Sequence, residues 1–176
     1  MVISGTAITY GDDISTDHIY PGRYTYLLLS EEEMASHAME DLDQSFSGRD
    51  VAGGILVAGT NFGCGSAREQ AVKCLKLKGI NAIVAKSIAR IFFRNCINEG
   101  LLPIVCPEAV AAIQDGDHVD IDLNKGVIKA GSGCFAFPGL PPFVMGIIEC
   151  GGLIPSVRME IEENRKGKGN EKDEPE

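Results

Sequence analysis

A glycine-rich segment over residues 59–71, Gly-Thr-Asn-Phe-Gly-Cys-Gly-Ser-Ala-Arg-Glu-Gln-Ala, constrains the fold of this chain more than any other stretch. It follows a short apolar run, residues 54–58, and precedes a run with helical spacing that ends at Gly79. This order predicts a strand, a sharp turn and a helix, because glycine allows backbone conformations that other residues avoid. Ser66 and Arg68 are expected at the helix entrance, where free N–H groups and the helix dipole favour a small anion.

Two interpretations of Ser66 follow from the spacing alone. Ser66-Ala67-Arg68-Glu69 fits the S-x-x-E capping box, in which the serine only caps the helix. Alternatively, the Ser66 hydroxyl takes part in chemistry beside Arg68. A nucleotide phosphate loop is excluded, because no lysine precedes Ser66 and the glycine spacing does not match a dinucleotide fingerprint.

Composition excludes several classes of protein. The chain has 176 residues, 44% of them hydrophobic and 23% charged, as expected for a single globular domain. A net charge of −9 and the absence of Trp argue against a nucleic-acid partner. No apolar run approaches the roughly 20 residues of a membrane span, and the start of the chain lacks a secretion signal. We therefore expect a cytoplasmic protein that contacts neither nucleic acid nor membrane.

The six cysteines lie ten or more residues apart and form no C-x-x-C pair. This spacing indicates neither a zinc site nor a complete set of iron–sulfur ligands. Most of them lie in apolar runs and are expected to be small buried residues in a reducing compartment. Cys64 lies in the glycine turn, where it could be either a packing residue or a reactive thiol.

Two further segments could contribute to a site. Residues 11–22 combine three aspartates with His18 in a loop, which is either a solvated turn or a place where Asp17 and His18 form a catalytic orienting pair. Leucines at positions 27–29 precede a second S-x-x-E box at Ser30, which predicts a helix to about Leu42. These leucines either enter the core or form an apolar wall for a ligand.

The remaining pattern is mixed α and β, with β/α alternation in the middle of the chain. A helix is expected over residues 87–98, capped by Ser87 and ended by Gly100, and another over residues 141–150. From residue 160 the chain becomes rich in charge, which is typical of a disordered tail. Strands are expected at residues 2–10, 81–85, 101–106, 118–123 and 126–129.

Three segments together resemble the small subunits of 3-isopropylmalate dehydratases, which are equivalent to the swivelling domain of aconitase. These segments are Thr16-Asp17-His18-Ile19, the turn over residues 61–71, and Gly151-Gly152-Leu153. The resemblance covers residues 1–158 and implies an α/β fold, the three-layer β/β/α swivelling domain. Residues 159–176 would then form the charged, disordered tail.

The resemblance also implies a function. In that family a large subunit carries a [4Fe–4S] cluster, so this chain would hold no cofactor and would be a hydro-lyase only with that partner. Ser66 would be the base that removes the proton α to a carboxylate, with Asp17 lining the same cleft. Arg68 would grip the substrate carboxylate, and a base that is positioned in this way is typically worth ~10²–10⁴ in rate. A serine is a poor base unless its alkoxide is stabilised, which a helix N-terminus and Arg68 could do.

Two positions bear on the substrate-binding turn and on substrate choice. The resemblance makes Gly65 and Ala67 substrate-binding residues of the turn. Ala67 stands where the family commonly has a second serine, so a secondary hydrogen bond to substrate would be missing. Leu28 falls where relatives acting on tricarboxylates carry an arginine, and a leucine would leave a third carboxylate without a partner. The substrate's third arm should therefore be alkyl.

Four possibilities for the function stay open at this point. 3-Isopropylmalate, the substrate of leucine biosynthesis, fits an alkyl arm, and so do 2,3-dimethylmalate and citramalate. The fourth possibility, from a different class, is a non-catalytic regulatory module in which the glycine turn only binds an anion.

Overall fold

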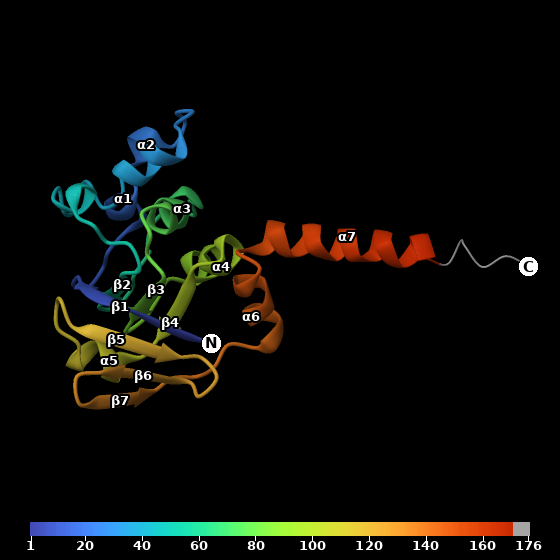
Figure 1. Ribbon diagram of the computed structural model, residues 1–176. Coiled ribbons are helices and arrows are strands. Elements are labelled where there is room, and N and C mark those ends of the chain that lie inside the picture. Colours follow the sequence, from blue (N-terminus) through green and yellow to red (C-terminus); the bar gives the residue numbers. More distant parts are fainter. Residues whose placement is uncertain (171–176) are drawn as a thin grey trace, which may run out of the picture.

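The computed structural model describes residues 1–170, and a seven-stranded sheet organises them (Figure 1). The strands lie in the order β4-β3-β2-β1-β5-β6-β7. Strands β1 to β4 are parallel to their neighbours in one half, whereas β5, β6 and β7 continue from β1 in antiparallel fashion. Their bounds are β1 Val2–Thr9, β2 Ile55–Ala58, β3 Ala82–Ala85, β4 Leu102–Val105, β5 His118–Asp122, β6 Val127–Ala130 and β7 Gly133–Ala136.

The helices connect the strands of the parallel half and then follow the last strand. Two single turns of 3-10 helix, η1 Gly22–Tyr24 and η2 Phe46–Gly48, lie between β1 and β2. The α-helices are α1 Thr16–Ile19, α2 Glu31–Ser36, α3 Gln70–Leu77, α4 Arg90–Glu99, α5 Pro107–Ala112, α6 Pro142–Glu149 and α7 Leu153–Asn170.

Alternation along the buried strands creates two cores. In β2, Leu56 and Ala58 face a core that includes residues of α1, α3 and α4, whereas Ile55 and Val57 face the other side. That second core also contains apolar residues of β5 and β6, so the antiparallel half of the sheet packs over the parallel half. The arrangement is helices on sheet on sheet, which confirms the predicted three-layer β/β/α fold.

The carboxyl ends of the parallel strands meet at one edge of the sheet. The loop before α1 follows β1, the glycine turn follows β2, and the segment that leads to α4 follows β3. Ligands of open α/β sheets bind in the crevice outside these carboxyl ends. The topology therefore brings the two polar segments of the sequence together.

Three local predictions differ from the structure. The helix after Ser30 ends at Ser36 rather than near Leu42, and turns follow, with Met39 in the left-handed region at φ 60°. The short strand β7 pairs with β6 but contains too little β-branched sequence to be predicted. Residues 159–170 continue α7, which projects from the body (Figure 1), where the sequence predicts the beginning of a disordered tail. The last part of that tail, residues 171–176, lies outside the described residues.

Among the described helices, no single one is both long enough and apolar enough to span a membrane. The pair Pro142–Glu149 and Leu153–Arg165, bent by 93° at its break, meets both conditions jointly by length and composition.

Candidate active site

Backbone hydrogen bonds join the loop after β1 to the glycine turn after β2. The N–H of Thr16 donates to the carbonyl of Cys64 at 2.7 Å, and the N–H of Gly63 donates to the carbonyl of Ile14 at 2.7 Å. These two segments are about fifty residues apart in the chain. Parallel pairing of β1 with β2 brings them side by side, so the site depends on the sheet rather than on local sequence.

Polar side chains fix the first residues of the glycine turn. The Asp12 carboxylate accepts a hydrogen bond from the N–H of Thr60 at 2.6 Å, and this bond lowers the pKa of that carboxyl. The Ser87 hydroxyl accepts from the N–H of Asn61 at 2.7 Å. The predicted capping role of Ser87 is therefore wrong: α4 begins at Arg90 with Ala89 at its N-cap, and Ser87 holds the turn instead.

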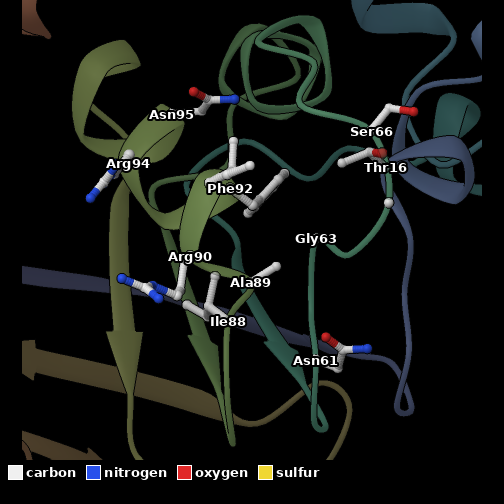
Figure 2. Close-up of a pocket in the computed structure, with 12 residues that line it drawn as sticks. Thr16, Asn61, Gly63, Ser66, Ile88, Ala89, Arg90, Phe92, Arg94 and Asn95 are labelled. Atoms are coloured by element: carbon white, nitrogen blue, oxygen red, sulfur yellow. The ribbon is translucent and has the colours of Figure 1, made fainter.

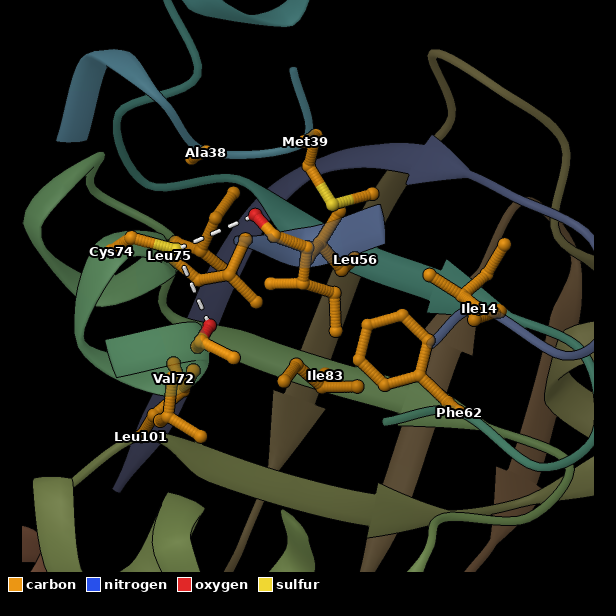
Figure 3. Close-up of a cluster of buried hydrophobic side chains, with 14 of the residues drawn as sticks. Ile14, Ala38, Met39, Leu56, Phe62, Val72, Cys74, Leu75, Ile83 and Leu101 are labelled. Carbon is orange, nitrogen blue, oxygen red and sulfur yellow. Dashed lines mark hydrogen bonds between the residues drawn. The ribbon is translucent and has the colours of Figure 1, made fainter. Parts of the chain in front are cut away.

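Phe62 anchors the middle of the turn in the core. Its side chain is fully buried near Ile14 and Ile83 (Figure 3), and its ring contacts that of Phe92 edge to face at 5.4 Å between centroids. The next residue, Gly63, has φ 75°, and a Cβ there would lie 2.1 Å from the Phe92 ring. Only glycine can occupy position 63 without moving α4.

Ser66 does not cap a helix. Helix α3 begins at Gln70 with Glu69 at its N-cap, and no side chain caps it. The predicted capping box is therefore wrong, and the helix entrance lies beyond Arg68 rather than at Ser66. Gly65, at φ 101°, turns the chain just before Ser66, and the serine is exposed. Its hydroxyl is consequently free for another role.

Arg68 is held by two oxygens of the neighbouring loop. It donates to the carbonyl of Tyr20 at 2.9 Å and pairs with the Asp17 carboxylate at 2.5 Å. The Arg68 side chain is only 11% exposed, whereas that of Asp17 is 60% exposed. A Cβ at Gly22 would lie 3.0 Å from the Asp17 carboxylate, so this glycine leaves room for the pair.

His18 does not form an orienting pair with Asp17. Its Nδ1 accepts a hydrogen bond from the N–H of Ser15 at 3.2 Å, and the Ser15 hydroxyl accepts from the N–H of His18 at 3.1 Å. The two residues form a reciprocal cap on α1. Asp17 therefore acts on Arg68, and His18 stabilises the loop that presents both.

A pocket of about 650 Å³ opens beside the glycine turn, and Ser66 lies in its lining (Figure 2). One wall comes from the turn and α1, the other from the start of α4. Arg68 and Asp17 are not among the residues that line it. The lining consists of Thr16, Asn61, Gly63, Gly65, Ser66, Ile88, Ala89, Arg90, Ile91, Phe92, Arg94 and Asn95.

The other two predicted substrate-binding residues lie outside this pocket. Ala67 is exposed and borders a neighbouring polar hollow with Met34 and Lys73. Leu28 is fully exposed at the tip of the segment between η1 and α2. The three leucines therefore do not enter the core as a group, and the roles of Leu28 and Ala67 stay predictions.

The sequence analysis assigns no role to two of the lining residues, Thr16 and Asn95. Thr16 belongs to the segment Thr16-Asp17-His18-Ile19 that carries the family resemblance. Asn95 occupies the buried face of α4 between Phe92 and Cys96. A polar residue within an otherwise apolar helical face was the signal that could have identified it.

All six cysteines are free thiols. Cys74, Cys96 and Cys106 are buried, and burial raises the pKa of the Cys74 and Cys96 thiols. Cys64 is half-buried and Cys134 is exposed. Within residues 1–170, no three His, Cys, Asp or Glu side chains are grouped so that they could hold a metal ion.

Comparison with known proteins defines the class to which this fold and site belong. The model of the aconitase C-terminal domain matches residues 13–109, a range that includes α1, the glycine turn and α4. The chain belongs to this aconitase C-terminal domain family. Among its relatives is the 3-isopropylmalate dehydratase small subunit of Moorella thermoacetica, 47% identical over 92% of this chain and 98% of the relative.

Two other relatives sharpen the comparison. The 2,3-dimethylmalate dehydratase small subunit of Eubacterium barkeri is 45% identical over 88% of this chain and 95% of the relative. A crystal structure of 3-isopropylmalate dehydratase from Methanocaldococcus jannaschii superimposes with a TM-score of 0.88. That protein is 41% identical, and the match covers 95% of this chain and 99% of the other.

Proposed function

We propose that this chain is the small subunit of a 3-isopropylmalate dehydratase, a hydro-lyase of leucine biosynthesis that works with a large subunit. Full-length relatives of that name, together with a free serine in the pocket, are the observations that support it. The anion-binding regulatory module has no such support among these relatives. A cytoplasmic location is expected because the pathway operates on soluble metabolites.

Ser66 is the proposed base of the reaction. Ser66 Oγ takes the proton from the carbon α to a carboxylate. The electron pair of the broken C–H bond forms the C=C bond, and the hydroxyl group leaves the neighbouring carbon. Within residues 1–170, the backbone N–H groups of Gly65, Ser66 and Ala67 donate no hydrogen bond. These N–H groups can stabilise a serine alkoxide in place of the helix entrance that the sequence predicted.

Arg68 is the proposed carboxylate ligand, and Asp17 is the residue that positions it. A guanidinium has five N–H donors, and Tyr20 and Asp17 occupy only part of them. The remaining donors can fork onto a substrate carboxylate, while the existing contacts fix the plane of the group. Asp17 thereby orients Arg68 without contacting the pocket.

The large subunit would supply the rest of the site. A [4Fe–4S] cluster there would provide Lewis-acid assistance to the departing hydroxyl. The described residues of this chain offer no ligand set for such a cluster, so we assign it to the partner. Leu28 would face the substrate's alkyl arm once the two subunits are together.

A second substrate fits the same site. The relative from Eubacterium barkeri is named for 2,3-dimethylmalate and is almost as similar as those named for 3-isopropylmalate. Both molecules are alkyl-substituted malates, and an apolar Leu28 suits either one. Measuring kcat/KM for both with the reconstituted enzyme would rank them.

Ser66→Ala tests the proposal directly. With the large subunit present, this change should lower kcat by ~10² or more, because a positioned base is removed. Size-exclusion chromatography should still show the assembled complex. Ser47→Ala, an exposed serine outside the pocket, is the control and should leave kcat unchanged. Near-normal turnover of Ser66→Ala would rule out Ser66 as the base.

A further inference from the structure

Two buried polar side chains of the described chain, Thr16 and Asn95, line the same pocket as Ser66. Thr16 is 1% exposed and Asn95 is 8% exposed. The side chains that form the two buried cores of the described chain are apolar. Buried polar groups normally have hydrogen-bond partners. In residues 1–170, the Thr16 hydroxyl has none, and no hydrogen bond involves the Asn95 amide. The Thr16 hydroxyl oxygen is itself fully covered, whereas the Asn95 amide keeps some exposed surface. The Asn95 amide is therefore the unpaired group that a ligand in the pocket could reach.

The position of Asn95 on α4 is costly for a structural residue. It lies on the helix face that carries Phe92 and Cys96, where an apolar side chain would pack against the core. Asparagine is also a weaker helix former than leucine. Its amide is directed toward the same side of α4 as Thr16 and Ser66, whereas Arg90 and Arg94 point away (Figure 2). Folding alone does not account for an asparagine here.

We propose that Asn95 is a further substrate-binding residue, whose amide N–H donates a hydrogen bond to a carboxylate oxygen of the bound malate. This inference rests on the proposed function and adds a neutral donor to it. An amide contributes direction without charge, so it can complement Arg68, which carries the positive charge. The ligand class is a small dicarboxylate, because each carboxylate then finds its own donor.

Thr16 supports the same assignment from the other wall. A Cβ at Gly65 would lie 3.1 Å from the Thr16 hydroxyl, so the absence of a side chain at position 65 leaves space beside that hydroxyl. An unpaired donor on each wall is what a pocket built for an oxygen-rich ligand requires. A purely apolar pocket would need neither.

The test replaces Asn95 and a matched residue on the same helix. Asn95→Leu keeps the approximate shape and removes the amide, while Asn98→Leu makes the same exchange at an exposed position outside the pocket. Both gain the same helix propensity. With the large subunit, Asn95→Leu should raise KM for 3-isopropylmalate roughly ten-fold or more, with a smaller change in kcat. Asn98→Leu should leave both constants unchanged.

Stability provides the second readout. Removing an unpaired buried amide should leave the Tm of the isolated chain equal or higher, because no hydrogen bond is lost. A structural asparagine would behave in the opposite way, with a lower Tm and an unchanged KM, and that result would overturn the proposal. Should Asn95→Leu fail to fold, Asn95→Asp decides, since a carboxylate there must repel the substrate and raise KM; an unchanged KM would overturn it.

The inference can also be separated from the proposed function. If the wild-type complex shows no turnover of either alkyl malate, the function fails, and direct binding then decides on Asn95. In ¹⁵N NMR spectra of the labelled chain in its complex, titrated with 3-isopropylmalate, the side-chain amide signal of Asn95 should shift while that of Asn98 does not. An unchanged Asn95 signal at ligand concentrations that shift the backbone signals of Gly65 and Ser66 would reject the proposal, and so would the absence of any shift in the pocket at saturating ligand.

Discussion

At the scale of single residues, the position of Arg68 depends on two oxygens of the neighbouring loop, the Tyr20 carbonyl and the Asp17 carboxylate. The spacing of the glycines in residues 59–65 and the apolar run at residues 54–58 are local signals. They are enough to predict that Gly65, Ser66 and Arg68 lie in one loop. The ion pair between Arg68 and Asp17 joins residues about fifty positions apart and forms only because β1 and β2 lie side by side. No local pattern indicates which of several aspartates an arginine will choose.

Arg68→Lys tests the proposed role of this residue. A lysine keeps the charge but cannot donate to Tyr20, Asp17 and a substrate carboxylate in one plane. We expect KM to rise by roughly ten-fold or more, as for the loss of a charge-assisted hydrogen bond, with less effect on kcat. Steady-state kinetics of the reconstituted enzyme measure both constants.

Arg23→Lys is the matched control for that change. Arg23 also forms two hydrogen bonds to one carboxylate, that of Asp41, at 2.8 Å each, but it lies outside the pocket. The substitution Arg23→Lys should therefore leave KM unchanged. Equal effects of the two substitutions would mean that Arg68 serves only the structure of the loop.

At the scale of elements, the strand–turn–helix order was predicted correctly, but the helix starts at Ser66 and Ser87 were not. The S-x-x-E pattern at Ser30 forms a capping box, whereas the same pattern at Ser66 does not. The difference lies in Gly63 and Gly65, whose positive φ values keep the turn open until Glu69. Helix α7 was missed because its charged composition is typical of disorder, although Glu, Arg and Met are also good helix formers.

The pH dependence of stability should report on the first residue that fixes the turn. The hydrogen bond from Thr60 lowers the pKa of Asp12 in the folded chain. A carboxyl with a lowered folded pKa stabilises the fold above its unfolded pKa, about 3.9, and loses that contribution as pH falls through the folded value. Asp12→Asn should therefore lower the Tm at pH 7, and the difference from wild type should shrink below about pH 4. Parallel Tm curves for the two proteins from pH 7 to pH 2.5 would contradict this role.

At the scale of the whole molecule, the site is open on one side. This chain supplies the proposed catalytic base, Ser66, and the wall of the pocket that α4 forms. The side chains of Tyr26, Leu27 and Leu28 are exposed, so no other part of the described chain covers them. Large apolar side chains in such a position are typical of a surface that meets a partner. This agrees with a site that two subunits complete together.

Leu28→Arg is the change that tests this arrangement. If Leu28 faces the substrate's third arm in the complex, the new guanidinium would lie where an alkyl group packs. The kcat/KM for 3-isopropylmalate should then fall by about ten-fold or more, from desolvated charge and lost apolar contact. A tricarboxylate of the citrate type should gain, because arginine can bind its additional carboxylate through two hydrogen bonds.

The ratio of the two kcat/KM values is the measurement, because it cancels changes in the amount of assembled enzyme. Leu153→Arg is the control: it introduces the same charge at an exposed leucine at the start of α7, away from the pocket, and should not move the ratio. A ratio that stays constant in Leu28→Arg would show that position 28 does not meet the substrate. The apolar tip would then serve contact between the subunits alone, and another residue would select the alkyl arm.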